Sequence, residues 1–232
     1  NGVARWDGSQ WQPVGQGIEL GGPEIGIIAM TSHETAQGSR LVVGGRFAAF
    51  ADETPTTNVA AWDGVSWSPL GEGPDELVYD LESVDFGSGA RLFAGGDFGA
   101  SGETEILRFA EWDGSAWNVP AGGTVDQSAG VGRAVRPLGD GSGGSLYVGG
   151  LFLSMGGTSA EHLARYDGAA YHDVGGGADW EVRGLGVRPP TESASGVLYV
   201  SGEFDRVGPQ IPQLRIAAWE GCPVPASGPV SD

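Results

Sequence analysis

The chain has 232 residues, of which 43 are glycine and 40% are apolar, and this combination excludes a disordered glycine-rich chain and favours a turn-rich all-β fold. Thirty acidic side chains stand against twelve basic ones, all of them arginine, and the formal charge of −18 disfavours nucleic acid and anionic membrane surfaces as partners. A cation or a basic protein fits this charge better, although solubility in a salty medium is its simplest explanation.

One motif recurs along the chain. It reads VARWDGSQW at Val3–Trp11, VAAWDGVSW at Val59–Trp67, FAEWDGSAW at Phe109–Trp117, LARYDGAAY at Leu163–Tyr171 and IAAWEGC at Ile216–Cys222. Its aromatic residues Trp6, Trp62, Trp112, Tyr166 and Trp219 are 56, 50, 54 and 53 residues apart. A fixed period of this length indicates a repeat architecture.

A second motif alternates with the first. It reads LVVGGRF ending at Phe47, LFAGGDF ending at Phe98, LYVGGLF ending at Phe152 and LYVSGEF ending at Phe204. In the second repeat, the pattern predicts strands over Leu77–Val84, Arg91–Phe98, Ile106–Trp112 and Trp117–Val119. The Asp-Gly pair before the last strand is typical of a hairpin turn, and no segment has a helical period. Each repeat of about 50–56 residues therefore predicts four short antiparallel strands.

Tandem four-stranded units of this length are typical of β-propeller blades. We name the strands of a blade A to D from the propeller axis outwards. The glycine pairs at 44–45, 95–96 and 149–150 fall in strand B, where close packing near the axis favours residues without side chains. The aromatic pair around each Asp-Gly is expected to fill the outer space between blades, and a sugar-stacking ladder is the alternative role for the tryptophans. The Asp itself is expected to accept hydrogen bonds from turn amides.

The strand count predicts a propeller over residues 1–221, followed by a tail rich in Pro and Ser over 222–232. The chain starts with a C–D pair and reaches its last C strand at Leu214–Trp219. We therefore expect five blades with one incomplete, and a four-bladed ring with one strand left over is the alternative. Because the sequence begins with Asn1 and not with an initiator Met, we also expect a processed product or a piece of a longer protein.

The W-D-G-x-x-W and L-Y-V-G-G-x-F motifs resemble the kelch-like repeats of galactose-oxidase-type propellers. They resemble more closely the tandem WDG repeats of large secreted bacterial proteins of planctomycete type. The resemblance covers nearly the whole chain up to Glu220 and implies a propeller in an extracellular or cell-surface location, but no particular activity. A galactose-oxidase-type copper site is not expected, because it uses a Tyr cross-linked to Cys and the single cysteine, Cys222, lies in the tail.

Acidic side chains gather in the D–A and B–C loops, which emerge on one face of a propeller. We take this face as the candidate ligand or cation site. Its residues are Asp52, Glu53, Glu72, Asp75, Glu76, Glu103, Glu105, Asp179 and Trp180, and the same loops also hold Asp126 and Glu181. Clustered carboxylates could bind Ca²⁺ or supply the acid and base of a glycoside hydrolase or lyase, and a merely solvated acidic face is the third interpretation.

No catalytic motif accompanies these loops. The histidines His33, His162 and His172 fall at unrelated repeat positions, without metal-ligand spacing. The apolar stretches, such as Ile25–Met30, are too short to cross a bilayer, so no membrane insertion is expected. The sequence therefore favours a non-enzymatic structural or binding module with a protein, matrix or cation partner and no cofactor. The alternatives are a fibre or layer subunit that self-associates through incomplete terminal strands or Cys222, and a carbohydrate-active propeller enzyme.

Overall fold

The computed structural model describes residues 2–19, 26–50, 55–125, 131–138, 144–191, 195–209, 211–212 and 215–220. Every regular element within these ranges is a β-strand, so the predicted all-β class is confirmed. Asp52, Glu53, Asp126, Cys222 and the tail lie outside the described residues. No described segment forms a helix long and apolar enough to cross a membrane.

Four antiparallel sheets, numbered in chain order, make up most of the molecule. Sheet 1 contains β4 (Gly26–Thr35), β5 (Gly38–Arg46), β7 (Val59–Trp62) and β8 (Trp67–Pro69). Sheet 2 contains β9 (Val78–Asp85), β10 (Ala90–Gly96), β13 (Phe109–Trp112) and β14 (Trp117–Asn118). Sheet 3 contains β15 (Val131–Pro137), β16 (Leu146–Leu151), β19 (Leu163–Tyr166) and β20 (Tyr171–Asp173). The strands of sheet 4 in the described part are β21 (Val182–Arg188), β22 (Val197–Gly202) and β25 (Ile216–Glu220).

The other strands form short two-stranded sheets. They are β1 (Ala4–Trp6) with β2 (Trp11–Pro13), β3 (Ile18–Glu19) with β6 (Ala49–Phe50), β11 (Ala100–Ser101) with β12 (Thr104–Glu105), β17 (Ser154–Met155) with β18 (Thr158–Ser159), and β23 (Arg206–Val207) with β24 (Ile211–Pro212). Strand order within sheets 1 to 3 follows chain order, as the repeat predicted. The register also repeats, because Leu41 pairs with Trp62, Leu92 with Trp112 and Leu146 with Tyr166. Equivalent positions of the repeats can therefore be compared directly.

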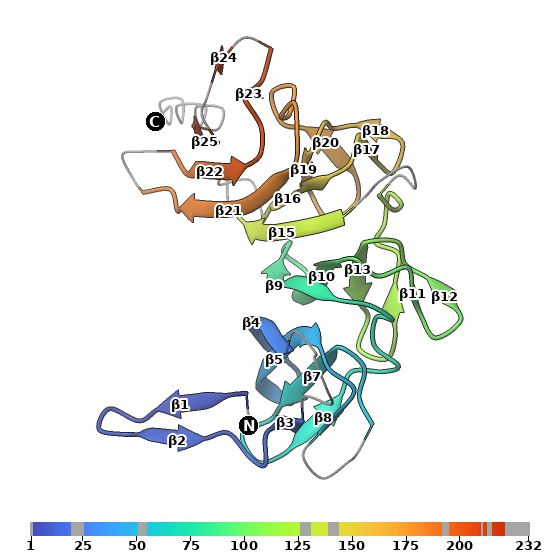
Figure 1. Cartoon of the computed structure of the whole chain (residues 1–232), viewed down its shortest axis with the longest axis vertical. Helices are drawn as coiled ribbons and strands as arrows, with labels where there is room; N and C mark the ends of the chain where they lie inside the picture. Colours follow the sequence, from blue (N-terminus) through green and yellow to red (C-terminus); the bar gives the residue numbers. More distant parts are fainter. Residues whose placement is uncertain are drawn as a thin grey trace, which may run out of the picture.

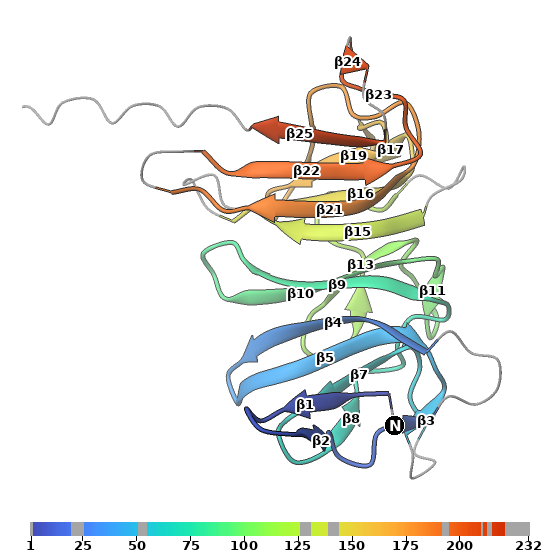
Figure 2. The ribbon, with the colours of Figure 1, turned by 60° about the vertical axis from the view of Figure 1, so that its left-hand side comes forward.

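The sheets stack face to face in chain order along the long axis of the molecule (Figures 1 and 2). The first strands contact one another in sequence, β4 with β9, β9 with β15 and β15 with β21. An apolar core fills each space between consecutive sheets, with Val42 and Leu81 in the first, Phe93 and Val148 in the second, and Leu198 in the third. The molecule is therefore held together by repeated sheet-to-sheet packing, each sheet contacting its neighbours in the chain.

The first glycine of each pair permits this close stacking. A Cβ atom on Gly44 would lie 2.8 Å from side-chain atoms of Val78 and Leu81 in β9. A Cβ atom on Gly95 would likewise lie 3.0 Å from Val135 in β15. Close packing at the first glycine of the pair is thus confirmed, since the first strand of the next sheet packs where a side chain would otherwise stand.

Strand pairing in the described residues closes no ring. β22 pairs with β25, and β1 pairs with β2, so the N-terminal hairpin does not complete sheet 4. The hairpin and sheet 4 lie at opposite ends of the stack (Figures 1 and 2). The observed architecture is an open stack of antiparallel sheets, with which a propeller is compatible.

The Asp-Gly turns form as predicted. In each, Asp Oδ1 accepts the backbone N–H groups two and three positions later at 2.7–3.0 Å. These aspartates are Asp7, Asp63, Asp113 and Asp167. The N–H groups of residues 115 and 116 favour the ionised carboxylate and hold the pKa of Asp113 below its usual range, so this repeated Asp is a structural residue.

The burial of the aromatic pairs increases from the N-terminal hairpin, where both rings are exposed, through sheets 1 and 2 to sheet 3, where both are buried. Trp117, Tyr166 and Tyr171 are at most 4% exposed, which confirms the predicted packing role. The prediction is wrong for the N-terminal hairpin, where Trp6 and Trp11 are 51% and 68% exposed. The physical reason is that β1 and β2 pair only with each other within the described chain, so no A and B strands extend their sheet and help to cover the rings.

Candidate functional site

The predicted acidic loops that the structure describes lie at one end of the strands. Residues 72–76 precede β9 of sheet 2, and Glu103 and Glu105 belong to the β11–β12 hairpin that follows β10. Asp179 and Trp180 precede β21 of sheet 4. The structure thus separates the predicted site into one group on sheet 2 and another on sheet 4.

Asp75 and Asp179 occupy equivalent places and fix their loops. Asp75 Oδ1 accepts the N–H groups of residues 99 and 100 at 2.8 and 3.1 Å. Asp179 Oδ1 accepts the N–H groups of Asp205 and Arg206, each at 2.9 Å. The Arg206 N–H, followed by that of Asp205, lowers the pKa of Asp179, so this carboxylate is ionised at neutral pH. Both aspartates therefore position backbone.

The remaining carboxylates of sheet 2 form its exposed acidic group. The Glu72 carboxylate lies against Gly102, the turn residue of the β11–β12 hairpin, and Glu103 and Glu105 are exposed on the same hairpin. Glu76 forms an ion pair with Arg46 at 3.2 Å, with both side chains about half exposed. An exposed ion pair of this kind contributes at most about 1 kcal/mol to stability. It neutralises only one of these carboxylates, so the surface stays acidic.

The sheet 4 group combines an aromatic ring with charge. Trp180 is 53% exposed, and its ring centroid lies 6.3 Å from that of His162. Asp179 and Arg206 line a hollow of about 580 Å³. Glu181 is buried and pairs with Arg133 at 2.6 Å, so it links β15 to sheet 4 and is not available to a ligand.

Within the described ranges, no three His, Cys, Asp or Glu side chains lie close enough together to hold a metal ion. Calcium binding by these loops stays a prediction. The candidate carboxylates of sheets 2 and 4 are distributed along an acidic surface or bonded to backbone.

A cavity of about 900 Å³ lies between sheets 1 and 2, near the opposite ends of the strands from the acidic loops. It is bounded by the β4–β5 turn, the start of β10 and the β13–β14 turn. Its lining includes the polar residues His33, Glu34, Thr35, Arg40, Arg91, Glu111 and Asp113 and the apolar residues Val42, Ala61, Leu70 and Trp112. The sequence analysis did not identify this cavity.

His33 joins the two sheets at the edge of this cavity. It is 8% exposed, and its Nδ1 lies 2.9 Å from Ser83 Oγ on β9. Burial lowers the pKa of His33, so its imidazole is neutral at pH 7. The side chain thus acts as an uncharged contact between sheets.

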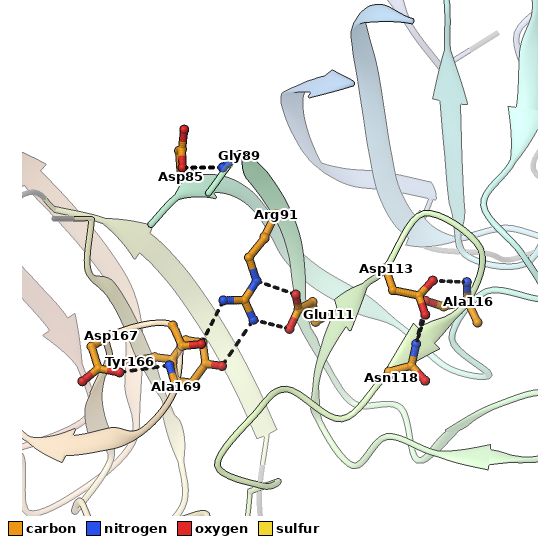
Figure 3. Close-up of polar contacts among 11 residues, drawn as sticks. Asp85, Gly89, Arg91, Glu111, Asp113, Ala116, Asn118, Tyr166, Asp167 and Ala169 are labelled. Atoms are coloured by element: carbon orange, nitrogen blue, oxygen red, sulfur yellow. Dashed lines mark hydrogen bonds and ion pairs between the residues drawn. The ribbon is translucent and has the colours of Figure 1, made fainter. Parts of the chain in front are cut away.

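The space between sheets 2 and 3 has the same position in the repeat but is filled. Arg91 Nε and Nη2 bind the two carboxylate oxygens of Glu111 at 2.5 and 2.6 Å, and Nη1 donates to the Gly168 carbonyl at 2.9 Å (Figure 3). The same guanidinium lies 5.1 Å from the ring centroid of Phe86, which packs edge-on against Tyr166. A bidentate ion pair and an aromatic ring therefore occupy this second space.

Sequence reasoning missed these residues because none belongs to either recurring motif in a constant form. Aligning the repeats by their Leu–aromatic register would have shown the signal, since Thr35 stands where the next repeat has Phe86, and Ala61 where it has Glu111. Small residues at positions that a neighbouring repeat fills with large ones indicate a hollow.

No protein-family model, curated protein or solved structure matches this chain. The chemistry of both regions therefore has to be derived from their residues.

Proposed function

We propose that this chain is a non-catalytic, secreted or cell-surface β-propeller-type module that presents its acidic loops to a basic protein partner. The resemblance of its motifs to kelch-like and WDG repeats supports the propeller type and the location. The stacking of first strands and the glycine pairs in strand B are the structural features compatible with it.

The observation that carries this proposal is the use of the repeated polar residues. Asp113 and its equivalents cap turns, and Asp75 and Asp179 fix loops, so these groups build the scaffold. The exposed carboxylates around the β11–β12 hairpin have no such task and add to a net charge of −18. A field of this sign attracts basic surfaces and speeds their association.

The test compares two charge-neutralised variants in binding a decalysine peptide by calorimetry. Glu103→Gln/Glu105→Gln removes two charges from the loop end of sheet 2. Glu34→Gln/Asp85→Asn removes two charges from the turn end and serves as the control. Because Asp85 Oδ1 accepts the N–H groups of Gly87 and Gly89, thermal unfolding checks that this variant keeps its fold. We expect about a fivefold loss of affinity for the first variant and less than about twofold for the control, because each exposed charge contributes about 0.5 kcal/mol. Equal losses in both variants would show that only the total charge matters and would overturn the proposal.

A second candidate function, self-association, is favoured by the outer face of sheet 4. Tyr199 and Ile216 are 42% and 62% exposed, whereas the equivalent Tyr147 and Leu163 of sheet 3 are buried against sheet 4. Ser201 on this face replaces the first glycine of the pair. A sheet of the same kind, from a second copy of the chain, fits there.

Light scattering over a concentration series tests this self-association. We expect the mass of the native chain to rise above 23.8 kDa with concentration and that of Ile216→Arg to rise less. A constant monomer mass would exclude it.

A further inference from the structure

The cavity between sheets 1 and 2 can be interpreted by comparison with the filled space between sheets 2 and 3. The repeated register makes the two spaces equivalent position by position. In this alignment Thr35 corresponds to Phe86, Arg40 to Arg91, Val42 to Phe93, Ala61 to Glu111, Trp112 to Tyr166, and Gly114 to Gly168.

The filled space shows which groups this geometry accommodates. A carboxylate from Glu111 binds the guanidinium of Arg91 through two hydrogen bonds. An aromatic ring, Phe86, packs at 6.0 Å from Phe93 and 5.7 Å from Tyr166, edge-on to both. A Cβ atom on Gly168 would meet Phe86 at 2.9 Å, so the turn is covered. The chain itself therefore supplies one carboxylate and one ring.

The space between sheets 1 and 2 lacks both groups. Thr35 has no ring, Ala61 has no carboxylate, and Val42 is smaller than Phe93. A Cβ atom on Gly114 would meet nothing within 4 Å, in contrast to Gly168. The outcome is the cavity of about 900 Å³, within the size range of small-molecule sites.

The arginine is nevertheless retained in the open space. Arg40 lines the cavity and is partly buried, and among the described residues it has no hydrogen-bond or ion-pair partner. Glu111, which also lines the cavity, is already bound on both oxygens by Arg91. A partly desolvated guanidinium facing a cavity is suited to bind a carboxylate through its paired donors.

From this comparison we propose that the cavity binds a small aromatic monocarboxylate. Its carboxylate would bind Arg40 as Glu111 binds Arg91, and its ring would lie against Trp112 and Val42 in the space that Phe86 occupies one repeat later. The exposed Glu34 and the ionised Asp113 also line the cavity, and their charges disfavour a second carboxylate on the ligand. This site is separate from the acidic loops, and its test does not depend on them.

Phenylacetate is the probe, and calorimetry together with tryptophan fluorescence gives the readout. For a ligand of this size we expect a Kd of about 1 mM or lower. Neutral phenylacetamide tests the carboxylate and should bind at least about tenfold more weakly, since it loses the charge-assisted hydrogen bonds to Arg40. Acetate tests the ring and should also bind at least about tenfold more weakly, since it loses the apolar area that the ring buries.

Three variants locate the site. Arg40→Gln should lower phenylacetate affinity at least about tenfold, whereas Arg5→Gln, the same change on the exposed strand β1, should leave it unchanged. Thr35→Phe should abolish binding while keeping Arg40, because it places a ring in the cavity. Thermal unfolding of each variant checks that it is folded. Absence of phenylacetate binding to the native chain, or equal binding by native chain and Arg40→Gln, would overturn the proposal.

Discussion

The first two interfaces of the stack, between sheets 1 and 2 and between sheets 2 and 3, use one backbone template with different side chains. Each interface has an outer side, next to the third and fourth strands of its sheets, and an inner side, next to the first strands. On the outer side, the second interface contains Phe86, Arg91 and Glu111, whereas the first contains a cavity. The template thus fixes the distance between sheets, and the side chains at a few positions decide whether the space is filled.

The inner sides of the two interfaces differ in the same way. Arg136 on β15 binds Asp80 at 2.6 Å and Glu82 at 3.0 Å, both on β9. The equivalents of these acids on β4 are Ala29 and Thr31, which carry no charge. The second interface is therefore held by the ion pair of Arg136 with Asp80 as well as by apolar contact. The first is held by apolar contact, by the hydrogen bond between His33 and Ser83, and by the exposed ion pair of Arg46 with Glu76. We therefore expect the two interfaces to respond unequally to mutation and pH.

The largest difference is expected from the ring that fills the second interface. Phe86→Ala should destabilise the protein by about 2–4 kcal/mol, because it removes an aromatic side chain packed against two others and leaves a hole. Thr35→Ala at the equivalent place should cost less than about 1 kcal/mol, since only turn hydrogen bonds are lost. Urea unfolding measures both. Equal costs would mean that the first interface is not open at this position.

The next effect concerns Glu82 and the dependence of stability on pH. Burial is the main reason that the pKa of Glu82 is raised to about 7, and the nearby Asp80 adds to it while Arg136 opposes it. The folded state then binds a proton more tightly than the unfolded chain, whose Glu titrates near 4.5. Stability contributed by protonated Glu82 is therefore lost as pH rises from about 4.5 to 7.

Glu82→Gln should remove this loss, on the order of 2 kcal/mol over that range. The measurement is the difference between native and variant unfolding free energies at pH 4.5, 6 and 7.5. Thr31→Val at the equivalent position of sheet 1 is the control and should show no pH-dependent difference. A constant difference between native chain and Glu82→Gln at all three values would contradict the prediction.

A smaller loss is expected from the ion pair on the outer side. Glu111→Gln should destabilise the protein by about 1–2 kcal/mol, because Arg91 keeps its bond to Gly168 but loses a charged partner. Ala61→Glu should instead stabilise the protein, since it places a carboxylate beside Arg40 as Glu111 does beside Arg91. Thermal unfolding at low and high salt compares them, and a destabilising Ala61→Glu would show that the first interface cannot accept the pair.

The features predicted from sequence are those that each repeat specifies by itself. The turn cap of Asp113 and the strand order depend on residues within about fifty positions, and they are conspicuous because they recur. The role of Gly44 was also predictable, since a glycine pair in the second strand of three of the repeats indicates a crowded position.

The candidate site was less predictable because it depends on which side chains of neighbouring repeats face each other. Asp75 was counted as a free carboxylate, but it accepts backbone N–H groups 24 and 25 residues away, which no local pattern shows. Trp6 carries the same motif as Trp112 but is exposed, because β1 and β2 pair only with each other within the described residues. The cavity at Arg40 arises from the small side chains of Thr35 and Ala61. Their role becomes visible only by comparison with Phe86 and Glu111 in the next repeat.

The smallest expected effect is a pH response of the first interface that is opposite to the response of the second. Because burial lowers the pKa of His33, the unfolded chain takes up a proton more readily below pH 6.5, and stability from the first interface is lost as pH falls. His33→Asn keeps an acceptor near Ser83 without titrating, so it should lessen the decline in stability between pH 6.5 and 5 by about 1 kcal/mol or less. Acid would then weaken the first interface, while base weakens the second through Glu82. An equal decline in stability in the native chain and in His33→Asn would show that the contact between His33 and Ser83 does not cause the acid response.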